Sequence, residues 1–355
     1  MRSRPVHSPQ PETKSHRRRR GTGDVRLNDI AKLAGVAPVT VSRVINAPET
    51  VAPATLQRVR EAIDRTGYVP NLLAGGLASA RSRLVAAIVP TIAAPVFQET
   101  IEALTNALAV AGYQMLLGQS GYGESREDAL LEAIIGRRPD GIVLTGIMRS
   151  PRMRLRLLAS GIPVVETWDL TPTPIDMLVG FSHESIGSVV ADHAHASGRR
   201  RLAIVTAADD RALLRAKGFA DAAARFGIGT ALASEIPVAI ASAPGTLGGG
   251  RRSFAELLAR HPTIDAVFCS SDMLALGVIT EAQARGIKVP TQIAVVGYGD
   301  TNFAADTVPA LTTVRVDGTA IGELAARRII DRADGRDGIP PVTDVGFSLI
   351  RRESA

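Results

Sequence analysis

The stretch LNDIAKLAGVAPVTVSRVIN, residues 27–46, decides the fold at the start of this 355-residue chain. Its apolar residues Ile30, Leu33 and Ala34 recur at the spacing of one helix face. Gly35 then breaks the helix, because glycine readily adopts the left-handed backbone of a turn. The pattern predicts a short helix, a tight turn and a second short helix.

The second helix of this pair has two different faces. Val41, Val44 and Ile45 form its inner, apolar face. Its outer face carries short polar side chains and one guanidinium, at Thr40, Ser42, Arg43 and Asn46. This combination is typical of a helix-turn-helix, whose second helix lies in the major groove of DNA.

An ordinary helical hairpin with a solvated polar face is the alternative. Three details favour DNA reading. Lys, Glu and Asp are absent from the outer face. Pro38 opens the second helix, where its missing N–H costs nothing. A third helix follows, with Pro53 at its start and Leu56, Val59 and Ile63 inward, and it closes a small core.

The composition indicates two or three domains with aliphatic cores, since the chain is 45% hydrophobic but only 4% aromatic. A single cysteine, Cys269, excludes an intramolecular disulfide and fits a reducing compartment. No apolar run has the length of a membrane span or follows the N-terminus as in a secretory signal. We expect a cytoplasmic, nucleoid-associated bacterial protein with no membrane partner.

Residues 1–23 carry seven Lys or Arg and one Glu, which accounts for the whole net charge of +6. This tail is rich in Pro, Ser, His and Arg and is predicted to be disordered. Two interpretations stay open. Either the tail adds non-specific affinity for DNA phosphates, or it is a solvated extension or the product of too early a start codon.

From Leu84 onward, apolar strands alternate with amphipathic helices. The predicted strands are 84–89, 113–118, 141–145, 162–166, 177–181, 201–206, 265–269 and 292–297. The predicted helices are 96–111, 125–136, 183–197, 211–226, 251–260, 272–285 and 317–332. Strict alternation implies parallel, doubly wound sheets with helices on both faces, and the length suits two such sheets hinged side by side.

No motif for catalysis, metal binding or cofactor binding stands out. A Gly-Lys-Ser phosphate loop, a G-x-G-x-x-G turn and a serine elbow are missing. Gly248–Gly250 are predicted to form a flexible loop before a helix. His193 and His195 are two residues apart and point to different helix faces, so they do not form a metal pair. We therefore expect no metal, no cofactor and no enzymatic activity.

Several segments carry a family resemblance. Near the N-terminus they are VTVSRVIN (39–46), GYVPN (67–71) and LAGGLAS (73–79). Later they are IPVV (162–165), VGFSH (179–183), RAKGF (215–219), SSDMLALGV (270–278), IAVVGYGD (293–300) and LTTVRVD (311–317). With these segments, residues 25–352 resemble the LacI/GalR family of transcriptional repressors. YQMLLGQSGYGE (113–124), GIVLTG (141–146) and VVETWDL (164–170) are most similar to its gluconate-repressor branch.

The resemblance implies a helix-turn-helix domain followed by a periplasmic-binding-protein-like effector domain of two parallel-sheet subdomains. The implied boundaries are 1–23 for the basic tail, 24–70 for the DNA-binding domain, 71–83 for the hinge helix and linker, and 84–352 for the effector and dimerisation domain. Its subdomains would be about 84–181 with 313–340, and 182–312 with 341–352. The protein would bind double-stranded operator DNA as a homodimer. The sequence shows no leucine-heptad tail of the kind that would favour a tetramer.

The resemblance also gives roles to individual DNA-binding residues. Base edges would be contacted by Pro38, Val39 and Arg43, and phosphates by Thr40, Ser42 and Asn46. Further backbone contacts would come from Asn28, Thr50, Thr55 and Asn71. Leu77 would be a wedge in the central minor groove, with Ala74 beside it. The side-chain chemistry of Arg43 fits this role, because a guanidinium can bind one guanine through two parallel hydrogen bonds.

The hinge departs from a good helix sequence at two positions. Gly75 and Gly76 each cost a helix about 1 kcal/mol relative to Ala. We therefore expect the hinge to fold only on operator DNA. For Leu77 an alternative exists, since an apolar residue in a short linker can pack on the next domain.

Arg211 and Arg215 are the strongest effector-site candidates, because they lie one turn apart at a helix start and suit a carboxylate or phosphate. The alternative is that Asp209 and Asp210 neutralise both at the surface. By resemblance, Phe97, Glu166, Trp168, Ser271 and Asp300 would join them. Phe97 could equally be core, and Asp272 is predicted to cap the helix that follows Ser271.

The acidic residue that many sugar-sensing relatives place after VVGY is Gly299 here, with Asp300 one position later. A sugar acid such as gluconate, or its phosphate, therefore suits the two arginines better than a neutral hexose. We expect a repressor that binds this effector between its subdomains. A solute receptor without a DNA role and a sugar-acid-metabolising enzyme are the competing interpretations. Induction, in which the ligand releases DNA, is favoured over co-repression, although the sequence does not decide between the two.

Overall fold

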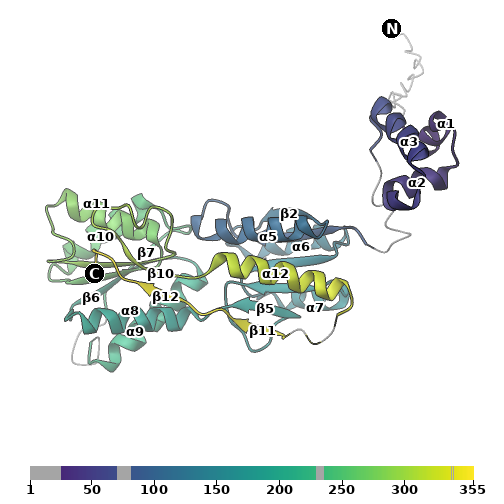
Figure 1. Cartoon of the computed structure of the whole chain (residues 1–355). Coiled ribbons are helices and arrows are strands. Elements are labelled where there is room, and N and C mark those ends of the chain that lie inside the picture. The colour runs from purple at the N-terminus through teal and green to yellow at the C-terminus, as the bar shows by residue number, and fades with distance from the viewer. Residues whose placement is uncertain (1–24, 70–80, 229–235, 337, 339) are drawn as a thin grey trace, which may run out of the picture. The chain divides into compact units, whose positions relative to one another are not determined.

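The computed structural model describes residues 25–69, 81–228, 236–336, 338 and 340–355. The chain divides into two compact units, Met1–Ala80 and Arg81–Ala355 (Figure 1). The predicted tail and the hinge positions Asn71, Ala74, Gly75, Gly76 and Leu77 lie outside the described residues.

The first unit is a small helical bundle. Its elements are α1 (Leu27–Ala34), α2 (Pro38–Asn46), the 3-10 helix η1 (Pro48–Thr50) and α3 (Pro53–Thr66). Ile30, Val41 and Val59 are fully buried at its centre. Gly35 ends α1 with a φ of 63°, in the left-handed region that glycine favours. Leu33 shares the apolar spacing of Ile30 and Ala34, but its side chain is 55% exposed, and Ala31 and Ala34 are the residues buried beside Ile30.

The second unit contains two six-stranded sheets, with strand orders β11-β5-β4-β3-β1-β2 and β12-β10-β9-β8-β6-β7. The first sheet consists of β1 (Leu84–Val89), β2 (Gln114–Gln119), β3 (Gly141–Thr145), β4 (Val164–Thr167), β5 (Met177–Gly180) and β11 (Val342–Asp344). The second consists of β6 (Leu202–Ala207), β7 (Val238–Ala241), β8 (Ala266–Cys269), β9 (Ala294–Tyr298), β10 (Thr312–Arg315) and β12 (Ser348–Ile350). All neighbours pair in parallel except β12, which is antiparallel to β10.

Helices cover both faces of each sheet (Figure 1). The helices are η2 (Pro95–Phe97), α5 (Gln98–Val110), α6 (Glu124–Ile135), α7 (Pro151–Ser160), α8 (His183–Ala196), α9 (Asp210–Arg225), α10 (Leu247–Arg260), α11 (Asp272–Ala284) and α12 (Gly318–Ala333). Along β1, Val85 and Ala87 pack toward α5 and α12, whereas Ala86 and Ile88 pack toward α6 and α7. This alternation is the two-residue period of a strand buried on both faces. Within the described residues, no helix is long and apolar enough to cross a membrane.

We call the two sheets with their covering helices the first and second lobes. The predicted division of the C-terminal segment between them was wrong in two places. β10 belongs to the second sheet, where it pairs with β9, and β11 belongs to the first, where it pairs with β5. The chain therefore crosses between the lobes after β5, after β10 and after β11. The short strands β7, β11 and β12, the strand β10 and the helix α7 were not predicted.

The prediction of a flexible glycine loop at Gly248–Gly250 was also wrong, because these residues form the first turn of α10. A Cβ at Gly250 would lie 2.2 Å from the backbone oxygen of Leu274 in α11. Gly250 is therefore required for close packing of α10 against α11.

Candidate functional site

The outer face of α2 carries the side chains that the sequence assigns to base reading. Pro38 and Arg43 are exposed, and the Val39 side chain is 58% exposed. Within the described part of the chain, the Arg43 guanidinium makes no hydrogen bond or ion pair. An exposed cation with all its donors free, next to two apolar side chains, suits a guanine beside a thymine methyl group.

The predicted phosphate-contacting residues flank this face. The Asn46 side-chain amide donates to the Ser42 carbonyl oxygen at 3.0 Å, which leaves its own oxygen free, and Thr40 is half-buried. Asn28 is exposed in the first turn of α1. The Thr50 hydroxyl donates to the Ala47 carbonyl oxygen at 2.7 Å and would have to rotate to donate to a phosphate.

The Thr55 hydroxyl accepts a 3.5 Å hydrogen bond from Arg58 and retains its own proton as a donor. The roles of Asn71, Ala74 and Leu77 stay predictions, because these residues lie outside the described parts of the structure.

The second unit contains a cavity of about 80 Å³ between the lobes, which we call the inner cavity. Its walls come from η2 and the end of β4 in the first lobe, and from the starts of α9 and α11 and the end of β9 in the second. Among its lining residues are Phe97, Trp168, His183, Arg211, Arg215, Ser271 and Tyr298. Phe97, Trp168 and Ser271 thus line one cavity with both predicted arginines.

Arg215 is held firmly in the wall of this cavity. Its Nη1 donates to His183 Nδ1 and its Nη2 donates to the Ser270 carbonyl oxygen, both at 2.9 Å. The guanidinium carbon lies 3.9 Å from the centre of the Tyr298 ring, a cation–π contact. The buried Nε of Arg215 has no hydrogen-bond partner among the described residues. A buried donor without a partner is costly, and a ligand acceptor in the cavity would satisfy it.

His183 is the residue that orients Arg215. Because its Nδ1 accepts from Arg215, its Nε2 carries the proton and donates to the Trp168 carbonyl oxygen at 2.9 Å. Burial, and then the charge of Arg215, hold the pKa of His183 well below its usual value. Burial also lowers the pKa of Arg215 and raises that of Tyr298 to about 12. At neutral pH the site therefore contains a neutral imidazole, a neutral phenol and a cationic guanidinium.

Arg211 bridges the two lobes. Its Nη1 donates to the Thr145 carbonyl oxygen at 3.2 Å, and its guanidinium carbon lies 5.4 Å from the centre of the Phe97 ring. The alternative of surface neutralisation does not hold for either arginine. Asp209 caps α9 by accepting from the Ala212 N–H, and Asp210 pairs with Arg149 at 2.8 Å. No carboxylate among the described residues forms an ion pair with Arg211 or Arg215.

Two predicted contacts lie elsewhere. Glu166 in β4 is fully buried, and its carboxylate accepts from the N–H groups of Met148 and Ile175, both at 2.8 Å. It does not line the cavity, because its side chain lies on the same face of β4 as Val164, toward Met148 and Ile175. Burial raises the pKa of Glu166. Its role is to hold two neighbouring loops.

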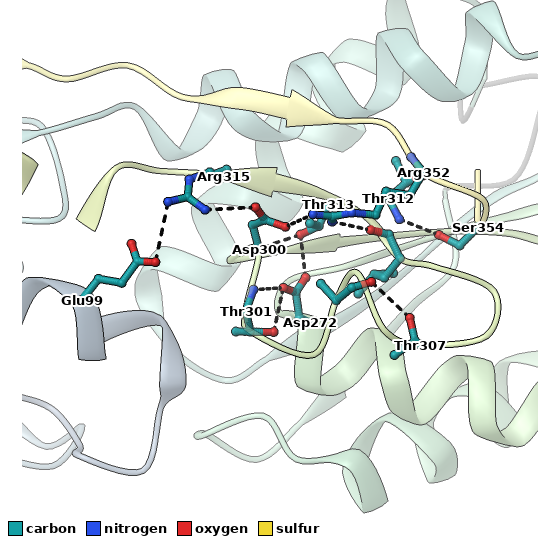
Figure 2. A network of polar contacts seen from close by, with 12 residues as sticks. Glu99, Asp272, Asp300, Thr301, Thr307, Thr312, Thr313, Arg315, Arg352 and Ser354 are labelled. Carbon is teal, nitrogen blue, oxygen red and sulfur yellow. Dashed lines mark hydrogen bonds and ion pairs between the residues drawn. The ribbon is translucent and has the colours of Figure 1, made fainter. Parts of the chain in front are cut away.

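Asp300 is also turned away from the cavity. Figure 2 shows its carboxylate between Arg315 and Arg352, at 3.3 Å and 2.6 Å. The positive φ of 44° at Asp300 directs its side chain toward these arginines. Asp300 is therefore part of an ion-pair network that extends through Arg315 to Glu99 of α5 in the first lobe, and it is not among the residues that line the cavity.

The cap of α11 also differs from the prediction. Ser271 is the capping residue, since its hydroxyl accepts from the Leu274 N–H, whereas Asp272 is buried. Asp272 accepts from the N–H and hydroxyl of Thr301 and from the Thr313 hydroxyl (Figure 2). It lines the inner cavity, but both of its oxygens are occupied.

The described residues contain no cluster of His, Cys, Asp and Glu that could hold a metal ion. Sequence reasoning missed His183, Ser270 and Tyr298, although each stands inside or beside a segment that carries the family resemblance. The site is an aromatic cavity with two guanidinium groups, neither of which forms an ion pair with a carboxylate in the described part of the chain. Such a pair of guanidinium groups suits a carboxylate or a phosphate.

Comparison with known proteins agrees with this combination of a helix-turn-helix and a two-lobed cavity. Residues 26–71 match the family described as bacterial regulatory proteins, lacI family. Residues 191–355 match a periplasmic binding protein-like domain. The chain is 39% identical over 346 residues to the HTH-type transcriptional regulator GntR of Pseudomonas aeruginosa, covering 96% of this chain and 99% of that protein.

Solved structures agree with the sequence match. A LacI-family regulator from Silicibacter pomeroyi superimposes with a TM-score of 0.86 at 31% identity, covering 93% of this chain and 99% of that one. The Lac repressor dimer bound to operator shares the fold, with a TM-score of 0.79 at 23% identity and coverage of 93% and 98%. The chain therefore belongs to the LacI family. It is a DNA-binding transcriptional regulator with an effector-binding domain, and the predicted fold class is confirmed.

Proposed function

We propose that this protein is an operator-binding repressor whose effector is a sugar acid, D-gluconate or a close relative or its phosphate. The observation that carries this proposal is the pair Arg211 and Arg215 without a carboxylate partner, with the buried Nε of Arg215 left unsatisfied. A guanidinium and a carboxylate form charge-assisted hydrogen bonds, which are stronger in a water-poor cavity. The sequence segments typical of the gluconate-repressor branch support the same choice.

The arrangement of the cavity supports control by cleft closure. Phe97 and Trp168 belong to the first lobe, whereas Arg215 and Ser271 belong to the second. A ligand that contacts both sets stabilises the closed arrangement over the open one. In a dimer, closure changes the angle between the two first lobes and separates the paired hinges. We propose that this releases operator DNA.

Two sheet edges support the proposed homodimer. β2 and β7 are edge strands with neighbours on one side only among the described residues. Leu116 and Leu117 on β2, and Val238 and Ile240 on β7, are exposed apolar side chains. Exposed apolar residues on an unprotected strand edge favour association, and here both lobes offer such an edge.

We expect the double substitution Leu117→Asp and Ile240→Asp to produce monomers at micromolar concentration. Two charges would have to be desolvated in each interface if the edges meet. Light scattering coupled to size exclusion measures the mass directly. The matched control is Leu155→Asp, an exposed apolar residue of α7 that belongs to neither edge strand. A dimeric double variant would contradict the assignment of these edges.

The effector proposal is tested by ligand binding coupled to DNA binding. We expect D-gluconate or its phosphate to raise the melting temperature, because a ligand that binds only the folded state stabilises it. At a hundred times Kd the gain is about 2.7 kcal/mol. The same compound should weaken operator binding in a band-shift assay, whereas D-glucose should do neither. Stabilisation by glucose but not by any sugar acid would overturn the proposal.

A further inference from the structure

Trp168 is hydrogen-bonded to a helix of each lobe. Its carbonyl oxygen accepts from Nε2 of His183, the first residue of α8, at 2.9 Å. Its ring Nε1 donates to the hydroxyl of Thr100 in α5 at 3.2 Å, and its ring packs edge-to-face against Phe97. Because His183 also accepts from Arg215, Trp168 connects the buried arginine of the inner cavity to α5.

The Thr100 hydroxyl is both an acceptor and a donor at this point. It accepts from Trp168 and donates to the Gly318 carbonyl oxygen, at the start of α12, at 2.8 Å. The residue is only 6% exposed. A buried hydroxyl with both partners in place fixes their separation, and its loss leaves both of them unsatisfied. Thr100 therefore joins the aromatic wall of the inner cavity to α12.

The backbones of α5 and α12 are in direct contact beside this hydroxyl. A Cβ at Gly322 would lie 2.5 Å from the Thr100 carbonyl oxygen and 2.8 Å from the Leu104 backbone nitrogen. Helices that meet through their backbones cannot absorb a displacement by changing side-chain rotamers, and closely packed interiors transmit strain. A shift at Thr100 is therefore passed to α12 as a whole.

The other end of α12 binds the residue at which the second unit begins. Arg81 Nη2 donates to the Ala333 carbonyl oxygen at 2.6 Å, and its Nη1 pairs with Asp334 at 2.8 Å. A cation at a helix C-terminus is also favoured by the helix dipole. Between these two ends α12 runs along the first lobe (Figure 1), and its 16 residues span about 24 Å. Arg81 lies in the predicted linker, residues 71–83.

We propose that Thr100 is a positioning residue in a relay from the inner cavity to Arg81. The relay consists of His183, Trp168, Thr100, α12 and Arg81, and this inference rests on the proposed control of operator binding by a ligand of that cavity. An anion that binds Arg215 pulls its guanidinium and, with it, His183 and Trp168. The displacement passes through Thr100 to α12 and changes the position from which the linker leaves the second unit. The relay is required for communication and not for binding itself.

The variants Thr100→Val and Arg81→Met interrupt the relay at its middle and at its end. Valine has the shape of threonine without the hydroxyl, and Arg81→Met removes the contact with the end of α12. Calorimetry measures the Kd of D-gluconate for the full-length protein with and without operator DNA. In the wild type, operator should weaken gluconate binding by about 5- to 150-fold, and in each variant by about threefold or less.

The double variant shows whether the two residues act in one path. If they do, Thr100→Val combined with Arg81→Met should lose no more coupling than either substitution alone. Thr105→Val, at an exposed hydroxyl of α5, and Arg327→Met, at an exposed cation of α12, are the matched controls and should keep the wild-type ratio of Kd values.

Two results of this series contradict the relay. A merely structural role for Thr100 or Arg81 would weaken gluconate or operator binding and leave the ratio of Kd values unchanged. Losses of coupling that add in the double variant would place the two residues in separate paths.

Trp168 is the only tryptophan of the chain, so its fluorescence reports on the relay without any effector. Coupling between two sites is reciprocal, and operator binding must therefore act back on the relay. We expect operator DNA, but not a scrambled duplex, to shift the emission of the wild type. Arg81→Met should bind operator without this shift. Wild-type emission that operator leaves unchanged, or a shift that persists in Arg81→Met, overturns the inference whatever the effector is.

The two proposals fail in different ways. If no sugar acid binds the wild type, but operator shifts the Trp168 emission and Arg81→Met abolishes the shift, the proposed effector is wrong and the relay stands. If gluconate releases DNA equally from the wild type, Thr100→Val and Arg81→Met, the effector is right and the relay is wrong.

Discussion

The variant Arg215→Met should lose its response to D-gluconate while it still binds operator DNA. Arg215 supplies the buried, unsatisfied donor of the inner cavity, and Met fills a similar volume without charge. Each charge-assisted hydrogen bond contributes about 1.5–3 kcal/mol, so the loss of two weakens binding by about 100-fold or more. In a band-shift titration, gluconate should no longer release DNA at any concentration that releases the wild type.

Two further variants make this result interpretable. Arg215→Lys keeps the charge but not the planar fork, so it should restore binding only in part. Arg225→Met removes an exposed cation at the other end of α9 and should behave as the wild type. Normal release of DNA by gluconate in Arg215→Met would show that the anion lies elsewhere.

The variant Arg43→Met should abolish selective operator binding without affecting effector binding. A bidentate contact with guanine contributes about 1–3 kcal/mol of discrimination. With one contact in each half-site of a dimer, the loss is roughly 2–6 kcal/mol, or about 30- to 20,000-fold in affinity. Fluorescence anisotropy with operator and scrambled duplexes measures both affinity and selectivity.

Arg65→Met is the matched control for this measurement. Arg65 is an exposed cation in the last turn of α3 and does not lie on the outer face of α2. Its loss should lower affinity slightly and equally for operator and scrambled DNA, because a phosphate contact carries no sequence information. If Arg43→Met retained the wild-type ratio between the two duplexes, base reading by Arg43 would be refuted.

The helix-turn-helix could be predicted almost completely from local patterns. Gly35 is the residue that the left-handed turn requires, and Pro38 and Pro53 stand at the first positions of α2 and α3. These are short-range signals, which a sequence displays directly. The exposure of Leu33 does not follow from the pattern, because the period of a helix does not show which edge of an apolar face is covered.

In the second unit, long apolar strands were predictable and polar or short ones were not. β10 contains Thr312 and Thr313, which are fully buried because their hydroxyls bond to neighbours such as Asp272 and Ala355. Such tertiary partners are invisible in the sequence. β11 and β12 are three residues long, too short for any periodicity to appear. Their places in different sheets depend on packing of the whole unit.

The candidate site shows the same limit. Arg211 and Arg215 were recognisable because two cations one turn apart at a helix start are unusual. His183 was not, since a lone histidine near a strand end gives no local sign that it will orient Arg215. Glu166 was misassigned because its carboxylate is used by the Met148 and Ile175 N–H groups, which the sequence does not place nearby.

The chain crosses between the lobes three times, after β5, β10 and β11, and this limits which parts of the protein can be exchanged with a relative. β11 completes the edge of the first sheet and β12 that of the second, although only a few residues separate them. Neither lobe can be transplanted by cutting the gene once or even twice. A chimaera that borrows this ligand response should exchange residues 81–355 as a block, at the natural boundary between the two units.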